Sequence, residues 1–367
     1  MRIESLELEN FRLHKKTKLE FSDKINYIIG GNGQGKTSIL EAIYYLCTTK
    51  SFINVKDVES INFEENFFHI KGKFFSKTNH CVEIDFRKEI NKKSVFIDNK
   101  QIYKATDLIG KFPVVILIHN DKEITKGSPA ERRKFVDSVI SQSSETYLKF
   151  YLDYNKALKQ RAVLLRKYKE TKSPKIIQQI DLWAETLINI GSQIIIHRID
   201  FINEFNSYVK KSFEKIMGEE EIPEIDYLYK NKNEIVNFLK NEFYKKKEEE
   251  LGRGKNLVGP QKDDFIFFIN KIPIRKYGSQ GQHKTFQIAL RFGQFFYLKE
   301  KTGRTPIFLM DDVFGDLDVF RAGKISSYLK EIGQAFITMT DFSNFKLLKN
   351  FENEKIIKIK KGEVIFD

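Results

Sequence analysis

The sequence contains little of what disulfide-stapled, zinc-binding or membrane-spanning proteins depend on. Its two cysteines, Cys47 and Cys81, form no CxxC pair and accompany no cluster of histidines, which argues against a disulfide framework and a structural zinc site. The N-terminus has no apolar core typical of a signal peptide, and the longest aliphatic runs, such as 114–118, are only strand-sized. We therefore expect a cytoplasmic protein without a membrane span.

Acidic residues are outnumbered by basic ones. The chain has 63 Lys and Arg residues against 50 Asp and Glu residues, so its formal net charge is +13. Such an excess suits a polyanionic partner such as nucleic acid, although a solvated basic surface would have the same composition. With 367 residues and 41% hydrophobic content, the chain is long enough to bury the core of one large domain or two ordinary ones.

Hydrophobic patterning predicts an α/β fold interrupted by a long helical segment. Alternating or continuous apolar residues predict strands before residue 120 and again after residue 260. Between them, apolar residues recur at intervals of three, four and seven, as expected for a helical hairpin with a break at Pro174. A projecting arm and a bundle packed on the rest of the protein fit this pattern equally well. The predicted strands are 3–8, 18–21, 25–29, several within 63–102, 112–118, 265–269, 306–310, 335–339 and a hairpin over 355–366, and the other predicted helices are 37–47, 281–299 and 320–331.

A glycine-rich loop with the pattern GxxxxGK[ST] follows a predicted strand and opens a predicted helix, which is the context that a P-loop requires. Its glycines let the backbone N–H groups approach the phosphates of ATP, its lysine reaches the β- and γ-phosphates, and its threonine hydroxyl ligates Mg²⁺. A chance glycine-rich turn is the alternative. The predicted nucleotide-binding residues are Gly30, Gly31, Asn32, Gly33, Gln34, Gly35, Lys36, Thr37 and Ser38.

Two carboxylates follow the apolar strand predicted over 306–310. We expect Asp311 to hold Mg²⁺ and Asp312 to orient or deprotonate the attacking water, with Lys36 as the second catalytic group. Two acids that merely end a strand are the alternative, and the P-loop upstream makes that alternative weaker.

The segment Ser279, Gln280, Gly281 and Gln282 is similar to the signature motif of ABC-type ATPases and opens a predicted helix. In those ATPases the motif contacts the nucleotide of the opposite subunit, so that ATP joins two heads into a dimer. Alone, the segment would suggest a helix N-cap. Residues 315–318, which resemble a D-loop, favour the signature interpretation.

Taken in order, these motifs resemble those of the RecF family, small SMC/Rad50-type ATPases of bacterial recombinational repair. The resemblance also includes residues 9–12 (ENFR), 127–133 (GSPAERR) and 259–264 (GPQKDD), where the family usually has arginine at the position of Lys262. It implies an ABC-type P-loop ATPase head split by a helical arm. The head would comprise residues 1–130 and 256–367, and the arm residues 131–255.

The resemblance further implies ATP-dependent homodimerisation, weak DNA-dependent ATPase activity used as a switch, and binding to single-stranded and gapped DNA. RecF-like proteins act with RecR and RecO and promote RecA loading in DNA replication, DNA repair and the SOS response. Another SMC/Rad50-like head and an ABC transport ATPase subunit are the alternatives. Threonines at 338 and 340, where many transporters have a histidine, count against the transporter.

Further site residues follow from the same resemblance. Arg12 is the expected phosphate-contacting arginine of the N-terminal loop, although an ion pair with an acid would suit it as well. Asn120 and Asp121 are candidates for the residue that senses Mg²⁺ and the γ-phosphate. DNA contacts are expected from cations near the start of the helical segment, with a solvated helix face as the alternative. These cations are Arg132, Arg133, Lys159, Arg161, Arg166 and Lys167.

Overall fold

The computed structural model describes residues 1–53, 55–118, 121–218, 220–316, 319–340 and 353–365. The chain divides into two compact units. Unit 1 comprises Met1–Asp121, Lys211–Glu220 and Gln287–Asp367, and unit 2 comprises Lys122–Lys210 and Glu221–Phe286. The chain passes between the units after residues 121, 210, 220 and 286, and the second and fourth of these crossings lie within helices α5 (Pro174–Met217) and α8 (Gln280–Thr302).

The first sheet of unit 1 has the strand order β15-β14-β3-β13-β12-β8, and its neighbours pair in parallel except for β14 and β15. Its central strands are short, almost continuously apolar runs, a composition typical of parallel strands covered on both faces. The predicted strands at these positions are confirmed. The bounds are β3 Ile25–Ile29, β8 Val114–Ile118, β12 Ile307–Asp311, β13 Ala335–Met339, β14 Glu354–Lys360 and β15 Glu363–Ile365.

The second sheet of unit 1 is antiparallel, with the order β2-β1-β4-β5-β6-β7. Alternating polar and apolar residues bury one face of the longer strands, as in β5, where Val82, Ile84 and Phe86 point inward. The bounds are β1 Arg2–Phe11, β2 His14–Glu20, β4 Phe67–Phe75, β5 Asn79–Arg87, β6 Lys92–Ile97 and β7 Lys100–Ile102.

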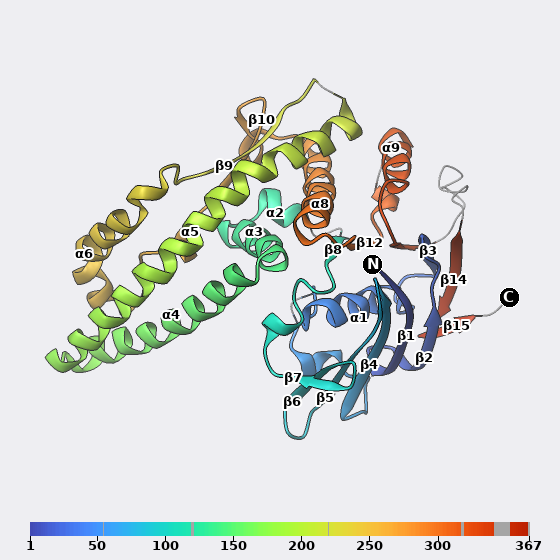
Figure 1. Cartoon of the computed structure of the whole chain (residues 1–367), viewed down its shortest axis with the longest axis horizontal. Helices are drawn as coiled ribbons and strands as arrows, with labels where there is room; N and C mark the ends of the chain where they lie inside the picture. Colours follow the sequence, from blue (N-terminus) through green and yellow to red (C-terminus); the bar gives the residue numbers. More distant parts are fainter. Residues whose placement is uncertain (54, 119–120, 219, 317–318, 341–352, 366–367) are drawn as a thin grey trace. The chain divides into compact units, whose positions relative to one another are not determined.

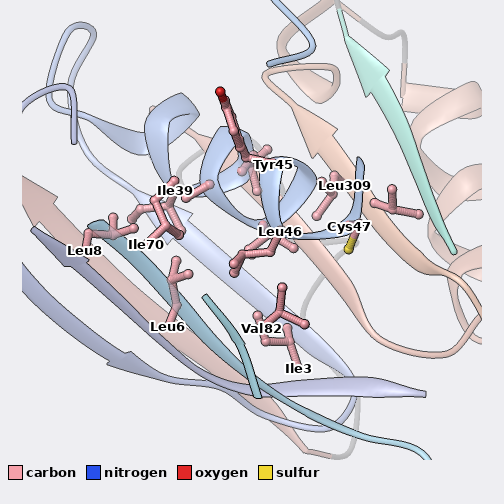
Figure 2. Close-up of a cluster of buried hydrophobic side chains, with 14 of the residues drawn as sticks. Ile3, Leu6, Leu8, Ile39, Tyr45, Leu46, Cys47, Ile70, Val82 and Leu309 are labelled. Carbon is pink, nitrogen blue, oxygen red and sulfur yellow. The ribbon is translucent and has the colours of Figure 1, made fainter. Parts of the chain in front are cut away.

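Helix α1 (Lys36–Thr48) supplies residues to the core that both sheets share (Figures 1 and 2). Its Leu46 lies near Ile3 of β1 and Val82 of β5 in Figure 2, and Leu309 of β12 belongs to the same buried cluster. Gly72 of β4 allows this close packing, because a Cβ there would lie 2.6 Å from Leu46 Cδ1. The first residues of α1 belong to the P-loop, so this packing also holds that loop in place. A further helix, α9, spans Val319–Leu329.

Unit 2 is built around α4 (Glu145–Thr171) and most of α5, the two helices of the predicted hairpin. Ser144 caps α4 by accepting a hydrogen bond from the Tyr147 amide at 3.1 Å. The predicted arm, 131–255, lies within unit 2 except for residues 211–220. The remaining elements of unit 2 are α2 Lys122–Lys126, α3 Pro129–Ser143, α6 Ile235–Arg253, α7 Ile274–Tyr277, β9 Pro223–Tyr227, β10 Phe265–Ile269 and β11 Ile272–Pro273. Among the residues that the structure describes, no helix is long and apolar enough to cross a membrane.

A buried cation, Arg198, joins several of these elements. Only 2% of its surface is exposed. It donates to both carboxylate oxygens of Asp137 on α3 at 2.9 to 3.0 Å, and to the carboxylate of Asp263, which precedes β10, at 3.0 Å. Burial opposes the charged form, but Asp137 and Asp263 more than compensate and raise the pKa of Arg198. The cluster therefore links α3, α5 and the segment before β10.

We predict that Arg198→Met destabilises the protein by about 3–5 kcal/mol, because the change leaves two buried carboxylates without their cation. Urea unfolding followed by far-ultraviolet circular dichroism measures the effect. Arg253→Met is the matched control, since Arg253 lies on the surface and pairs with the partly exposed Glu249. Equal unfolding midpoints for the two variants would contradict the role given to Arg198.

Candidate nucleotide-binding site

The P-loop connects β3 to α1 at the carboxyl end of the parallel sheet, where ligands bind in open α/β folds. Gly33 and Gly35 have φ values of 72° and 101°, a conformation that favours glycine. A Cβ on Gly30 would lie 2.3 Å from the Ile359 carbonyl oxygen of β14. The backbone amides at the start of α1 form a site suited to an anion such as phosphate.

The side chain of Lys36 is folded over this loop. Its Nζ donates to the carbonyl oxygens of Gly30 at 2.6 Å and Gly31 at 2.8 Å. Burial lowers the pKa of Lys36, while the carboxylates of Asp312 and Asp311 oppose that shift. The loop thus holds a partly desolvated cation, which interacts strongly with anionic oxygens.

A threonine hydroxyl and a carboxylate meet where the strands end. Thr37 Oγ1 lies 2.9 and 3.0 Å from the two carboxylate oxygens of Asp311. Thr338 of β13 also donates to Asp311, at 2.8 Å. Burial raises the pKa of Asp311, and hydrogen bonds from Thr338 and Thr37 oppose that shift. Hydroxyl and carboxylate oxygens are ligands that Mg²⁺ accepts, so this pair fits a magnesium ion.

The neighbouring acid, Asp312, has a different environment. Its side chain is exposed, its φ is 49°, and its amide donates to Thr338 Oγ1 at 2.9 Å. Positive φ at a non-glycine residue is a strained conformation that recurs at functional sites. This backbone conformation separates the two consecutive carboxylates. Asp311 is hydrogen-bonded to Thr37, and Asp312 is open to solvent. In the described part of the chain, no three His, Cys, Asp or Glu side chains gather as a metal site.

Residues far from the P-loop in sequence support its outer side, and sequence reasoning missed them. The fully buried ring of His14 lies 3.0 Å from both the Gly35 carbonyl oxygen and Thr17 Oγ1. Thr17 in turn donates to the Gly362 carbonyl at 2.9 Å, and the Gly362 amide donates to the Gln34 carbonyl at 3.0 Å. Strand β2 and the C-terminal hairpin therefore brace the loop.

Arg12 is engaged with a carboxylate. Its guanidinium donates to both oxygens of Glu41, a buried residue of α1, at 2.7 and 2.9 Å, and to the Glu59 carbonyl at 2.7 Å. The structure thus shows the ion pair that was the alternative to a phosphate contact, with a buried acid instead of a surface acid. Glu41 lies on the first turns of the P-loop helix, so the pair connects Arg12 to that helix.

The signature segment belongs to unit 2, whereas the P-loop and Asp311 belong to unit 1. The Ser279 hydroxyl accepts from the Gln282 amide at 3.1 Å, and the Gln282 side chain accepts from the Ser279 amide at 2.9 Å. This reciprocal pair is a capping box at the start of α8. Ser279 and Gln280 are exposed, and Gly281 is exposed to an intermediate degree.

The other sequence candidates fall in two groups. Asp121 is 3% exposed and its carboxylate accepts two hydrogen bonds from Arg291, at 2.5 and 2.8 Å, so it is held in an ion pair. Asn120, together with 317–318 of the D-loop-like segment, lies outside the described residues.

Two of the six predicted DNA contacts are wrong. Arg132 is 3% exposed and pairs with Asp264 at 2.7 Å. Arg161 is 2% exposed and pairs at 2.6 Å with Glu250, which is itself fully buried. Buried, fully paired guanidinium groups are not available to DNA phosphates. The other four reach the surface: Lys159, Arg166 and Lys167 are exposed and Arg133 is half-buried.

The sequence of this chain is similar to a known protein family over nearly its full length. The family model of the RecF/RecN/SMC N terminal domain matches residues 2–363. The DNA replication and repair protein RecF of Chloroherpeton thalassium is 37% identical over 362 residues, covering 95% of this chain and 97% of that protein. The protein of the same name from Salinibacter ruber is 32% identical over 374 residues, covering 99% and 91%.

Two solved structures have a fold similar to that of this chain. The recombination mediator protein RecF-ATPrS in the RecFOR pathway matches with a TM-score of 0.90 and 32% identity, over 99% of this chain and 97% of that chain. An Smc head domain derived from Pyrococcus furiosus matches with a TM-score of 0.58 at 15% identity, over 99% of this chain and 95% of that chain, which supports the ABC-type ATPase fold alone. The chain belongs to the RecF family.

Proposed function

We propose that this chain is an ATP-dependent DNA-binding protein of recombinational repair, with weak ATP hydrolysis used as a switch. The observation that carries the proposal is the contact between Thr37 on the P-loop and Asp311 at the end of β12, at 2.9 Å. A metal-ligand pair of this kind beside a P-loop is the arrangement that P-loop ATPases use. Family membership supports the repair function.

ATP is the proposed nucleotide. One solved relative is described as RecF-ATP and matches this chain with a TM-score of 0.89. In this chain the amides of Gly33 to Thr37 and the Nζ of Lys36 would bind the phosphates. Among the residues that the structure describes, Lys36 bonds only carbonyl oxygens of the loop, at 2.6 and 2.8 Å, and phosphate oxygens would take their place.

Magnesium is the proposed metal, held by Thr37 and Asp311. When bound, it neutralises charge on the phosphates during phosphoryl transfer. Thr338 keeps the Asp311 carboxylate oriented through its 2.8 Å hydrogen bond, and Asp312 would orient the attacking water. An exposed aspartate with a short side chain suits slow hydrolysis.

We propose that a second copy of the chain completes the nucleotide-binding site. The capping box of Ser279 and Gln282 shapes the start of α8, and the amides and hydroxyl there suit the γ-phosphate of a facing subunit. ATP bound between two subunits would then join them, so that occupancy of the nucleotide site controls DNA binding.

The proposed partners of this chain are DNA, RecR, RecO and RecA. Exposed cations on α4, namely Lys159, Arg166 and Lys167, suit sequence-independent contacts with single-stranded and gapped DNA. The description of a solved relative as part of the RecFOR pathway supports action with RecR and RecO. From the family resemblance we extend the proposal to RecA loading and to a place in the cytoplasm. We assign the ATPase head to residues 1–130 and 256–367 and the DNA-contacting arm to 131–255.

Lys36→Ala should abolish the ATP dependence of DNA binding, because the variant lacks the cation that reaches the phosphates. We expect ATP to increase the DNA affinity of the wild type at moderate salt by at least roughly tenfold, about 1.4 kcal/mol, and to leave the variant unchanged. Fluorescence anisotropy with a gapped duplex measures both affinities. Lys50→Ala, at an exposed lysine after α1, should behave as wild type. An ATP response that survives in Lys36→Ala would refute the nucleotide gate.

Ser279→Arg should leave the chain monomeric in the presence of ATP, because a long cation replaces the hydroxyl that faces the second nucleotide. Sedimentation velocity with ATP and magnesium compares this variant with the wild type, which should dimerise. Ser207→Arg introduces the same side chain at an exposed serine of α5 and should dimerise normally. A dimer of Ser279→Arg would rule out the cross-subunit signature.

Asp311→Asn should stabilise the protein at neutral pH while it removes magnesium-dependent ATP binding. Burial raises the folded-state pKa of Asp311, so the ionised carboxylate destabilises the fold above that pKa, and the cost disappears as the pH falls below it. The gain in melting temperature should therefore be larger at pH 8 than at pH 4.5. Thermal scans at both pH values, with the exposed Asp312→Asn as control, test this. A loss of stability at pH 8 would contradict the account.

A further inference from the structure

Unit 2 contains a cavity of about 200 Å³ that no part of the ATPase site uses. Its floor is buried and includes Asp137, Arg198 and Tyr154, and its walls are the half-buried side chains of Arg133 and Tyr151. The exposed Lys134 lies at its mouth, and Asn155 and Gln261 also line it.

Helix periodicity explains why these side chains converge. On α3, Ala130, Arg133, Lys134 and Asp137 are spaced by three, one and three residues and share one face. On α4, Tyr151, Tyr154 and Asn155 do the same. The floor is rigid, because Arg198 and Asp137 hold each other in place and Tyr154 donates to Gln261 at 2.5 Å.

The cations of the cavity differ in how far protein groups satisfy them. Arg198 is neutralised by Asp137 and Asp263. Arg133 donates through Nη1 to the Asp263 carbonyl at 2.6 Å, and its Nε and Nη2 groups have no hydrogen-bond partner within the described ranges. Those two N–H groups form the side-on fork that matches two oxygens of a phosphate or carboxylate. Burial and the neighbouring Arg198 lower the pKa of Arg133, although the carboxylates of Asp137, Asp263 and Asp264 partly oppose that shift.

The size of the cavity limits the ligand. A volume of about 200 Å³ is below the roughly 300–1,000 Å³ that encloses a whole small-molecule ligand. The cavity therefore suits one anionic group presented by a larger molecule, and a complete nucleoside triphosphate is too large for it.

The surface next to the cavity indicates what that larger molecule is. Asn155, Lys159 and Arg166 are spaced by four and seven residues, so they lie on one face of α4, and both cations are exposed. This basic stripe runs from the cavity for roughly 16 Å at about 1.5 Å per residue, a distance that spans several phosphates of a strand. A polyanion with regularly spaced charges matches the stripe better than a single acidic side chain.

We propose that this cavity anchors one backbone phosphate of a nucleic-acid strand, with the phosphate on Arg133 and Lys134 and the following phosphates on Lys159 and Arg166. The proposal rests on the proposed DNA binding and adds to it a defined anchoring site. Tyr151 and Asn155 form the wall that orients the strand.

The experiment compares the salt dependence of binding of a single-stranded oligonucleotide to the wild type, Arg133→Gln and Lys134→Gln. Each lost phosphate contact should reduce the slope of log K against log salt by about 0.7 and weaken binding several-fold at low salt. Lys240→Gln removes an exposed cation of α6 and should leave the slope unchanged. Lys134 has no side-chain bond to a described residue, so its variant avoids any folding defect of Arg133→Gln.

Two further arms identify the source of the anion. Inorganic phosphate should inhibit wild-type DNA binding more than chloride at equal ionic strength, and Arg133→Gln should lose that excess inhibition. Polyglutamate is the competing ligand class: if both pocket variants lose polyglutamate binding but keep the wild-type DNA slope, the cavity binds acidic peptides and the proposal is overturned. Slopes equal to wild type in both variants overturn it as well, while DNA binding itself stands. A wild type that binds no DNA at any salt concentration overturns both proposals.

Discussion

A carboxylate held between two threonine hydroxyls is the interaction on which the nucleotide site depends. Asp311 accepts from Thr37 and Thr338, so one side chain connects the P-loop, β12 and β13. The parallel register of the sheet makes this possible, because it aligns Asp311 with Thr338 and β13 with β3. Asp311 is a partly buried acid whose ionised form costs stability, and the proposed magnesium ion would relieve that cost. Its position at the strand ends also leaves Asp312 exposed beside it.

In unit 2, buried ion pairs connect elements in the way that Asp311 connects the P-loop to β12 and β13. Arg198 with Asp137 and Asp263 connects α5 to α3 and to the segment before β10, and Arg161 with Glu250 connects α4 to α6. Such clusters need every polar atom satisfied, which makes the surrounding geometry specific. The cavity beside Arg133 inherits its rigid floor from the Arg198 cluster. A structural network and a candidate ligand site thus share residues, and this sharing explains how one short stretch of α3 contributes to both.

The parts of the site that follow local rules could be predicted from the sequence, and the parts that depend on distant contacts could not. The P-loop, the strand before Asp311 and most helices have short-range signals, namely glycine spacing and apolar periodicity. The prediction that Arg132 and Arg161 contact DNA is wrong because nothing near them in sequence indicates their carboxylate partners, Asp264 and Glu250. His14 supports the P-loop from 21 positions before Gly35, and Gly362 supports it from near the other end of the chain. Arg198 did carry a signal, since a lone cation interrupts an apolar stripe between Ile194 and Phe201.

We propose that the P-loop forms half of a composite site that a second copy of the chain completes. The dependence of specific ATPase activity on protein concentration distinguishes this composite site from a site within one chain. At saturating ATP and magnesium, the activity per chain should rise with protein concentration and reach a plateau once dimers dominate. An activity per chain that stays constant from the lowest measurable concentration to well above the plateau range would show that one chain hydrolyses ATP alone, and would contradict the account.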